Sequence, residues 1–405
     1  MRRAEALARL EKAEWLARAA PFFACLDGAS GATRAVGGIV RDTLLGIERT
    51  QTDLDLATTL LPNDVMARAT AAGLGAHPTG IDHGTVTLVH GGMTAEVTTL
   101  RQDVETYGRH ARVVFGSDWE ADAARRDFTM NALYAGGDGT LFDPLGGLED
   151  CLARRVRFIG DPAQRLAEDR LRVYRYFRFC ASHGEQRFDP DALAACAAAA
   201  HDLSRLSAER VGQEMTRLLA LPRIGNTLSA MIGIGLLAEG MDVAGAMGVF
   251  ERYEHIDPEP ALAARLGIIL KNGLSADDLK TRWRLSSRLM REAEAILEAA
   301  RCLLADRVNE VAYRWPEIKL HAVYLGAALG GKPDAWVERH VEILTQIDPP
   351  PFPLDGRDLK ALGYAPGEAL GAELARLKGM WIERGFVPDR AALLALAAPP
   401  QSNNS

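Results

Sequence analysis

The amino-acid sequence predicts an α+β protein, in which a mixed α/β region at the N-terminus is followed by an all-helical remainder. Two observations support this prediction. Over roughly the first 150 residues, short β-branched or apolar runs alternate with helical stretches and Gly-rich turns. From Gly160 onward, apolar residues recur at helical spacing and strand signals nearly vanish.

The composition is that of a globular chain with several domains. The 405 residues are 48% hydrophobic and 25% charged, which excludes a disordered or fibrous chain, and they are too many for one core. No run approaches the ~20 apolar residues of a membrane helix, so we expect no membrane association. The five cysteines are scattered without a CxxC pair, as in a reducing compartment. The Arg-rich N-terminal segment contains glutamates and no apolar signal core, so we expect an amphipathic helix and a cytoplasmic location.

Strands and joints can be placed along the chain. The expected strands are residues 33–36, 53–57, 85–89, 94–99, 113–115 and 133–135. Breaks are expected at 142–147, at 221–226 and at the proline run 349–353, because proline cannot continue a helix. These breaks predict four domains, which are residues 1–150, 151–220, 221–348 and 349–405.

Residues 35–46 (AVGGIVRDTLLG) predict a strand that ends at paired glycines, followed by a short helix that Gly46 closes. Glycine lets the backbone approach a ligand closely, and a helix start offers free N–H groups, so Gly37 and Gly38 are a candidate phosphate cradle. Arg41, about one turn into the helix, can add a charge-assisted contact. For paired glycines taken alone, a tight strand-to-helix turn is the better explanation.

Residues 51–57 (QTDLDLA) place two carboxylates on one face of a strand. Side chains at i and i+2 share a face and lie about 6.5–7 Å apart at Cα, so Asp53 and Asp55 converge while Leu54 and Leu56 face the other side. This spacing suits divalent ions ~3.5–4 Å apart, as in two-metal phosphoryl or nucleotidyl transfer. An Asp pair that caps a turn explains the motif equally well by itself, but the glycines upstream favour the metal site.

Two further blocks combine charged and aromatic residues: RRDFTMNAL at residues 125–133 and EDRLRVYRYFRF at residues 168–179. In the second block, charged residues three apart would form a slowly winding ridge on a helix. They are Asp169, Arg172, Arg175 and Arg178. Charge runs usually lie on a solvated face, yet the interleaved aromatic residues favour the wall of a half-buried cleft. The block belongs to a local arginine surplus, an anion-binding patch in a chain with a net charge of −7.

With these blocks the chain resembles the class II template-independent nucleotidyltransferases, the family of bacterial CCA-adding enzymes and poly(A) polymerases. The resemblance is strong from residue 35 to about residue 220 and weak beyond. It rests on GGIVRDTLLG with DLDLAT, EVTTLRQDVETYGRHARVVF, RRDFTMNALY, FDPLGGLEDC, GDPAQRLAEDRLRVYRYFRF and LSAERVGQEMTRLL. It implies a polymerase-beta-like nucleotidyltransferase head over residues 1–150. A helical neck for base recognition (151–220) and a helical body and tail that bind tRNA (221–348 and 349–405) would follow.

The resemblance also implies roles for single residues. Asp53 and Asp55 would bind Mg²⁺ and activate the terminal 3′-hydroxyl of the RNA. The nucleotide and its triphosphate would be held by Gly37, Gly38, Arg41, Arg175, Arg178 and either Arg125 or Arg126. Asp169 and Arg172 would act as a protein template for the base.

Hydrogen-bonding groups explain such a template. A carboxylate accepts from the exocyclic amino group of cytosine or adenine, and a guanidinium donates to the adjacent ring nitrogen. Guanine and uracil present a carbonyl oxygen where the carboxylate needs a donor. Because unpaired polar groups in a site weaken binding strongly, such a site accepts CTP and ATP and refuses GTP and UTP.

Three segments have weaker assignments. Glu96 is a candidate third acidic group, although pairing with Arg101 explains it equally well. Residues 101–112 resemble the family's flexible loop, associated with the switch from C to A addition, with a plain β-hairpin as the alternative. In the predicted helix 207–219, Glu209 and Glu214 can brace arginines of the neighbouring helix.

The implied activity is template-independent addition of CCA to the 3′ end of tRNA, with release of pyrophosphate. A poly(A) polymerase shares the motifs, but the acidic balance and the lack of a long basic C-terminal extension count against it. An enzyme that adds only part of the CCA end is a second alternative. A non-catalytic tRNA-binding protein is a third, disfavoured because both Asp53 and Asp55 are present. The sequence does not fix the oligomeric state.

Overall fold

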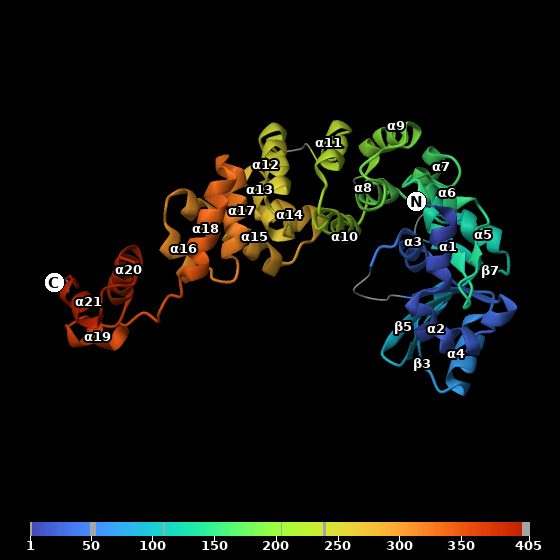
Figure 1. Cartoon of the computed structure of the whole chain (residues 1–405), viewed down its shortest axis with the longest axis horizontal. Helices are drawn as coiled ribbons and strands as arrows, with labels where there is room; N and C mark the ends of the chain where they lie inside the picture. The colour runs from blue at the N-terminus through green and yellow to red at the C-terminus, as the bar shows by residue number, and fades with distance from the viewer. Residues whose placement is uncertain (1, 49–53, 108–109, 204, 238–239, 399–405) are drawn as a thin grey trace. The chain divides into compact units, whose positions relative to one another are not determined.

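The structure, a computed structural model, describes residues 2–48, 54–107, 110–203, 205–237 and 240–398 (Figure 1). Two compact units are found. The first comprises residues 1–214 with 233–236, and the second comprises residues 215–232 with 237–405. The finer division into four domains stays a prediction.

A mixed β-sheet forms the centre of the first unit. Within the described residues its seven strands follow the order β3-β4-β5-β2-β1-β8-β9. Their bounds are β1 Thr33–Val36, β2 Leu54–Thr58, β3 Gly75–Gly80, β4 Thr85–His90, β5 Met93–Thr99, β8 Tyr134–Ala135 and β9 Leu141–Phe142. β2 and β5 pair in parallel, whereas the other neighbours are antiparallel. The predicted mixed-sheet head is therefore confirmed.

Tight turns and alternating burial set the register of the sheet. Leu54 and Leu56 of β2 are 1% exposed, whereas Asp55 between them is exposed, as period-2 alternation predicts. β4 and β5 are joined by Gly91 and Gly92, whose φ angles of 55° and 74° are those of a two-residue hairpin turn.

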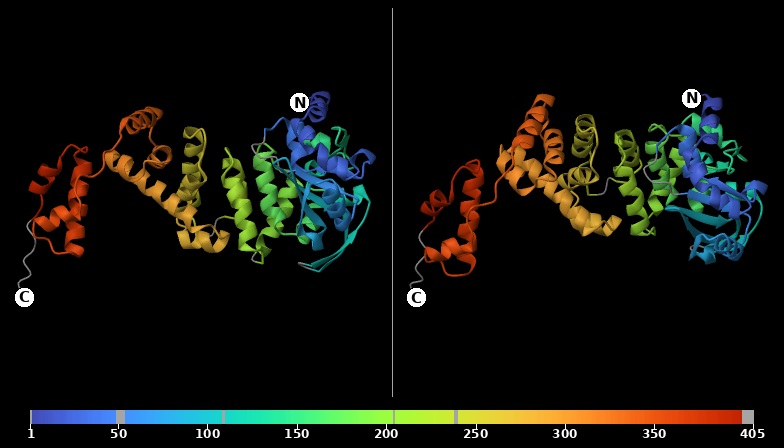
Figure 2. Two further views of the ribbon diagram at one scale, coloured as in Figure 1. Left: turned by 90° about the horizontal axis from the view of Figure 1, so that it is seen from below. Right: turned by 60° about the horizontal axis from the view of Figure 1, so that its bottom comes forward.

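Three strands escaped prediction because their local signals are weak. The sequence of β3 contains glycine and proline, both depleted in strands, and β9 has only two residues. β6 (Arg101–Tyr107) is rich in polar residues and pairs with β7 (His110–Phe115) in a separate antiparallel sheet. Residues 101–107 and 110–112 thus lie in the paired strands of a β-hairpin, the alternative, shown in teal in Figure 2. Its part in nucleotide switching stays a prediction.

Helices flank the sheet of the first unit. They are α1 (Arg3–Glu11), α2 (Glu14–Cys25), α3 (Gly38–Leu45), α4 (Pro62–Ala71), α5 (Trp119–Ala124) and α6 (Gly147–Leu152). The single N-terminal helix that we expected is therefore two helices, because Ala13 has an extended conformation. The chain then continues through α7 (Pro162–Glu168), α8 (Arg172–Ser182), α9 (Pro190–Ala199) and α10 (Ala208–Leu219).

The second unit is helical throughout its described residues, as the periodicity predicted (Figure 2). Its helices are α11 (Gly225–Gly233), α12 (Val243–Ile256), α13 (Leu262–Lys271), α14 (Ala276–Trp283), α15 (Ser287–Leu304), α16 (Val308–Arg314), α17 (Lys319–Gly330), α18 (Asp334–Gln346), α19 (Gly356–Ala361), α20 (Glu368–Glu383) and α21 (Arg390–Ala395). Among the helices described, none is long and apolar enough to cross a membrane.

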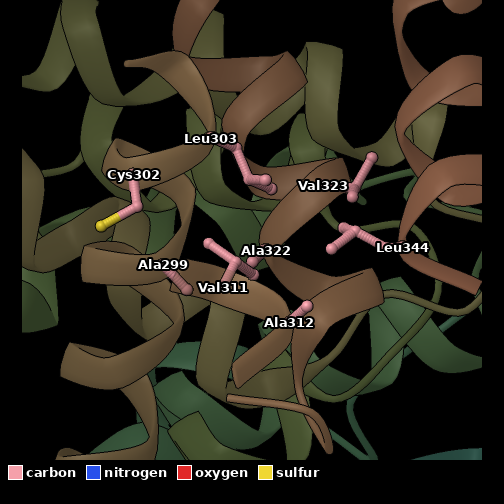
Figure 3. Close-up of a cluster of buried hydrophobic side chains, with 8 residues drawn as sticks. All are labelled: Ala299, Cys302, Leu303, Val311, Ala312, Ala322, Val323 and Leu344. Carbon is pink, nitrogen blue, oxygen red and sulfur yellow. The ribbon is translucent and has the colours of Figure 1, made fainter. Parts of the chain in front are cut away.

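Apolar clusters hold these helices together. Cys302, Val323 and Leu344 belong to a buried cluster that joins α15, α16, α17 and α18 (Figure 3). A separate cluster around Trp381 unites the last three helices. Leu359 and Leu377 of that cluster are fully buried, so the C-terminal segment contributes a core of its own.

A buried arginine fixes the predicted break near residue 221. Arg265 of α13 has no exposed surface and donates to the carbonyl oxygens of Leu219 (2.7 Å), Leu221 and Pro222 (2.8 Å). It also pairs with Glu254 of α12 at 3.1 Å. The arginine thereby satisfies carbonyl groups that the end of α10 leaves without helical partners.

Candidate active site

The paired glycines join β1 to α3. Gly37 has φ 72° and ψ −124°, a backbone conformation that residues with a Cβ rarely adopt. α3 begins at Gly38 and ends at Leu45, and Gly46 caps it with the left-handed φ of 66°. This strand, glycine turn and short helix confirm the local structure that the motif predicted. The arrangement directs the free N–H groups of a helix start toward the end of a strand.

Arg126 is the arginine of the RRDFT block that lies beside this turn. A Cβ placed on Gly37 would be 4.0 Å from Nη1 of Arg126, and no similar approach is found for Arg125 in the described residues. Arg126 donates to the hydroxyl of Tyr134 (3.1 Å) and to Asp122 (3.0 Å). The structure thus distinguishes two residues that the sequence left equivalent.

Asp122 holds both arginines of the block. Its carboxylate is 1% exposed and accepts from Arg125 at 2.6 Å and from Arg126 at 3.0 Å. Burial alone would raise the pKa of Asp122, but the two guanidinium charges and a hydrogen bond from Tyr134 bring the pKa below its ordinary value. The carboxylate therefore stays ionised and fixes the direction of both arginine side chains.

The acidic pair is described in part. Asp53 lies outside the described residues. Asp55 is exposed on β2, and the register of β1 and β2 pairs Ala35 with Leu56. One step further along this register places Asp55 opposite Val36, the residue before Gly37. Asp55 therefore lies at the same end of β1 as the glycine turn.

Glu96 is the acidic residue that sequence reasoning left undecided. In the parallel pairing of β2 and β5, Glu96 lies directly beside Asp55, and both are exposed on the same face of the sheet. Arg101, the alternative partner, donates to the carbonyl oxygen of His83 at 3.2 Å. The signal that identifies Glu96 is the register of two strands about forty residues apart, which no local pattern carries.

Carboxylates on adjacent strands, about 4.8 Å apart at the backbone, are suitable ligands for a hard divalent cation. Asp55 and Glu96 supply two such groups. In the described part of the chain no cluster of three or more His, Cys, Asp or Glu side chains forms a ready cation site. The donor set on these strands nevertheless fits a metal ion that is held together with a nucleotide and water.

Arg41 lies inside the protein and is 6% exposed. Its Nε and Nη2 both donate to Oδ1 of Asp42 at 2.8 Å, and Nη1 donates to Asn131 at 2.5 Å. The amide of Asn131 in turn donates to Asp127 at 2.9 Å. Hydrogen bonds thus fix the Arg41 side chain under the start of α3.

The arginines of α8 continue this network. Asp127 accepts from Arg175 at 2.6 Å, and Glu214 of α10 accepts from Arg175 at 3.5 Å and from Arg178 at 2.5 Å. Burial would raise the pKa of Asp127, but Arg175 and the hydrogen bond from Asn131 lower it overall. The bracing by Glu214 that the sequence predicted is confirmed.

The two residues predicted to read the base lie where α7 gives way to α8. Asp169 has an extended conformation (φ −147°) and Arg172 is the first residue of α8, so the expected ridge does not lie on one continuous helix. Asp169 accepts from Arg210 at 2.7 Å, and Arg172 donates to Glu168 at 2.6 Å. Both side chains are paired with other residues at this site.

Arg165 is a residue that sequence reasoning did not single out. It is 8% exposed and donates to the backbone carbonyl oxygens of Arg125 (2.6 Å) and Arg126. It also pairs with Glu168, which holds Arg172. Arg165 thereby connects the RRDFT block to the start of α8. It had no distinguishing signal among the many arginines of its segment.

Comparisons with known proteins agree with this geometry. The poly(A) polymerase head domain family matches residues 33–157, and a family described as a probable RNA- and SrmB-binding site of polymerase A matches residues 187–240. The mitochondrial CCA tRNA nucleotidyltransferase 1 of Danio rerio is 32% identical over 385 residues, covering 89% of this chain and 86% of that protein. The CCA-adding enzyme of Geobacillus stearothermophilus is 36% identical over 325 residues, covering 75% of this chain and 76% of that protein.

Solved structures give the same result. The crystal structure of the Bacillus stearothermophilus CCA-adding enzyme in complex with CTP has a TM-score of 0.75 and 29% identity, and covers 93% of this chain and 96% of that one. Together with the relatives, it shows that the described sheet and helices are those of this group. The chain belongs to the family of CCA-adding enzymes, or tRNA nucleotidyltransferases, and bacterial poly(A) polymerases.

Proposed function

We propose that this protein adds CCA to the 3′ end of tRNA without a nucleic-acid template, using CTP and ATP and releasing pyrophosphate. The observation that carries the proposal is the placement of Asp55 and Glu96 at the same end of the sheet as the Gly37 turn, with Arg126 beside that turn. Relatives whose names specify CCA addition cover most of the chain. A cytoplasmic site of action is part of the proposal.

Nucleotidyltransferases generally depend on a divalent metal ion, and we propose Mg²⁺ held by Asp53 and Asp55, with Glu96 as a further ligand. When bound, Mg²⁺ supplies charge stabilisation of the phosphoryl oxygens and lowers the pKa of an attacking hydroxyl. The carboxylates position the 3′-hydroxyl of the RNA close to the α-phosphate. Because Asp55 and Glu96 are exposed on neighbouring strands of the sheet, these two need little rearrangement when substrates bind.

The triphosphate is bound by the backbone and by cations. The N–H groups at the start of α3 point to the phosphates, and Gly37 permits their close approach. Arg126, held in place by Asp122, neutralises negative charge that develops on the leaving pyrophosphate. Arg41 of α3 and Arg175 and Arg178 of α8 complete the positive surroundings.

Base selection is assigned to Asp169 and Arg172. The ion pair of Asp169 with Arg210 joins partly exposed side chains and contributes at most about 1 kcal/mol, so a cytosine or adenine edge can replace Arg210 at little cost. Arg172 is less exposed, and Glu168 and the carbonyl oxygen of Arg165 (2.8 Å) orient its guanidinium. Guanine and uracil would leave the carboxylate of Asp169 facing a carbonyl oxygen, so they are refused.

One assay separates the candidate activities. Purified protein is given tRNA transcripts that end before CCA, after C or after CC, with labelled CTP alone, ATP alone or both. We expect each transcript to be extended to CCA and no further. A-tails of unlimited length would instead identify a poly(A) polymerase, and extension only of the transcript that ends after CC would identify an A-adding enzyme. No incorporation at all would support a tRNA-binding protein without catalytic activity.

A further inference from the structure

His183 and Asp42 form a buried contact that none of the assigned roles uses. Oδ1 of Asp42 accepts three hydrogen bonds, two from Arg41 at 2.8 Å and one from Nε2 of His183 at 3.1 Å. Asp42 is 6% exposed and His183 is 9% exposed. Asp42 belongs to α3, whereas His183 caps the C-terminus of α8, so the contact joins segments 141 residues apart.

The chemistry of the contact fixes the form of the imidazole. Burial lowers the pKa of His183, and Arg41 and Arg178 act in the same direction, so the ring is neutral at physiological pH. The pKa of Asp42 is lowered by His183 and Arg41 despite burial, so its carboxylate is ionised and can only accept. Nε2 of His183 therefore carries the proton. Nδ1 accepts from the hydroxyl of Ser182 at 2.6 Å, which stabilises the same tautomer.

The ring of Phe179 provides a second contact between α8 and Arg41. The guanidinium of Arg41 lies 5.1 Å from the ring centroid, and those of Arg175 and Arg178 lie at 5.5 Å and 4.5 Å. His183 stacks on the same ring at 5.4 Å with an interplanar angle of 28°. Three arginines assigned to the nucleotide thus surround one aromatic side chain, and His183 packs against that side chain.

We propose that His183 is a positioning residue for nucleotide binding, which acts through Asp42 to hold the Arg41 guanidinium under the phosphate-binding start of α3. This inference rests on the proposed function, because it takes Arg41 to be part of the nucleotide site. His183 touches neither substrate nor reacting atoms. Its effect is to fix the distance between α3, which binds phosphate, and α8, whose first turn reads the base.

The expected effect is on affinity rather than on the chemical step. An arginine side chain loses rotamer freedom when it is immobilised. In this protein the hydrogen bonds to Asp42 and Asn131 impose most of that loss before the nucleotide arrives. Without the donor from His183, Asp42 has one partner fewer and Arg41 is held less firmly, so more of the cost falls on nucleotide binding.

The test compares His183→Leu with His183→Gln in the full-length chain. Leucine keeps apolar bulk against Phe179 but cannot donate, whereas the glutamine amide can donate to Asp42 in place of Nε2. We expect His183→Leu to raise KM for both CTP and ATP about tenfold, the loss typical of one hydrogen bond to a charged group. We expect kcat and KM for tRNA to stay within about threefold, and His183→Gln to restore KM for the nucleotides.

Two further variants complete the design. Ser182→Ala removes the hydroxyl that fixes the tautomer, and we expect a smaller rise in nucleotide KM, in the same direction. His201→Leu replaces an exposed histidine in the same unit and should leave all constants unchanged. If His183→Leu does not fold, the proposal is tested by comparing the nucleotide KM of His183→Gln with that of Ser182→Ala. We expect the KM of Ser182→Ala to be the higher.

Three results would overturn the proposal. They are an unchanged nucleotide KM in His183→Leu, an equal rise in the Leu and Gln variants, or a fall in kcat without a change in KM. The Asp55→Asn variant is assayed in parallel, so that failure of the positioning role can be distinguished from failure of the proposed function. If Asp55→Asn is inactive and His183→Leu behaves as wild type, only the positioning role is lost. If the wild-type protein incorporates neither CTP nor ATP, the proposed function itself fails, whereas full activity of Asp55→Asn would only remove Asp55 from the site.

Discussion

Asp55 is a carboxylate exposed on a strand whose neighbours on either side are buried leucines. Aspartate is depleted in strands, and a second acidic residue, Glu96, lies directly beside it. Two adjacent negative charges repel each other unless a cation is bound between them. At the scale of single residues, this is the arrangement that most strongly indicates metal-dependent chemistry.

The first prediction concerns this carboxylate. Asp55→Asn keeps the shape of the side chain and removes the charge that binds a metal ion. We expect nucleotide incorporation to fall by at least about 1,000-fold, the scale of losing a group that stabilises transition-state charge, while tRNA binding in a filter assay changes less than about twofold. Asp82→Asn, at an exposed position in the same unit, is the matched control. Undiminished incorporation would remove Asp55 from the site.

The second prediction concerns base choice. Arg172→Ala removes a donor that Glu168 holds at the start of α8. We expect discrimination between CTP and UTP to decrease by about 10- to 100-fold, because a missing hydrogen-bond donor costs selectivity. Metal affinity should not change. The control is Arg170→Ala, which removes a nearby arginine that pairs with Asp202. Nucleotide preference identical to wild type in Arg172→Ala would contradict the templating role.

The sequence predicts the position of a single residue where that position depends on its neighbours along the chain. The alternation of Leu54, Asp55 and Leu56 predicted which side chain would be exposed, and Gly46 predicted the end of α3, because both depend on neighbours along the chain. Glu96 depends on the register of another strand. His183 depends on a segment 141 residues away. No local periodicity encodes either partner.

At the scale of helices and strands, buried charges fix the ends of elements. Arg265 connects α13 with the carbonyl groups at the end of α10, and Glu254 accepts from the N–H groups of Ile224 (2.8 Å) and Gly225 (3.3 Å) at the start of α11. One ion pair thus serves the end of one helix and the beginning of the next. The proline and glycine of this segment indicated a break but not what holds it.

The third prediction follows from this pair. Arg265→Ala leaves the partly buried carboxylate of Glu254 without this cation and three carbonyl groups without a donor from a fully buried side chain. We expect the free energy of unfolding to fall by about 3–5 kcal/mol, as for other broken buried pairs, measured by urea denaturation. Arg291→Ala, on the exposed face of α15, should change it by less than about 0.5 kcal/mol. A small effect of Arg265→Ala would show that water replaces the side chain.

At the scale of the whole molecule, the chain consists of two compact units, and every described residue assigned to the nucleotide lies in the first. A ligand stabilises the folded state to which it binds, by about 2.7 kcal/mol at a concentration of 100 Kd. A nucleotide should therefore act on one unit selectively. The helical second unit contains Arg265, so the two units can be perturbed independently.

The fourth prediction uses this separation. In scanning calorimetry we expect two unfolding transitions. CTP with Mg²⁺ should raise the midpoint temperature of only one of them, and Arg265→Ala should lower the midpoint temperature of only the other. ATP should act as CTP does, and UTP should have a smaller effect. A single transition that both perturbations shift equally would show that the units unfold together, contrary to this expectation.

The turn at Gly91 and Gly92 has a consequence for how this enzyme can change over time. Because side chains alternate along β5, a shift of β5 by one residue against its neighbouring strands would exchange the layer of Ala95 and Val97 with that of Glu96, and the two-residue turn fixes this register. Such a shift would bury Glu96 and remove its side chain from beside Asp55. Changes in the length of this turn are thus constrained by the register of β5 rather than by any contact of the turn with substrate.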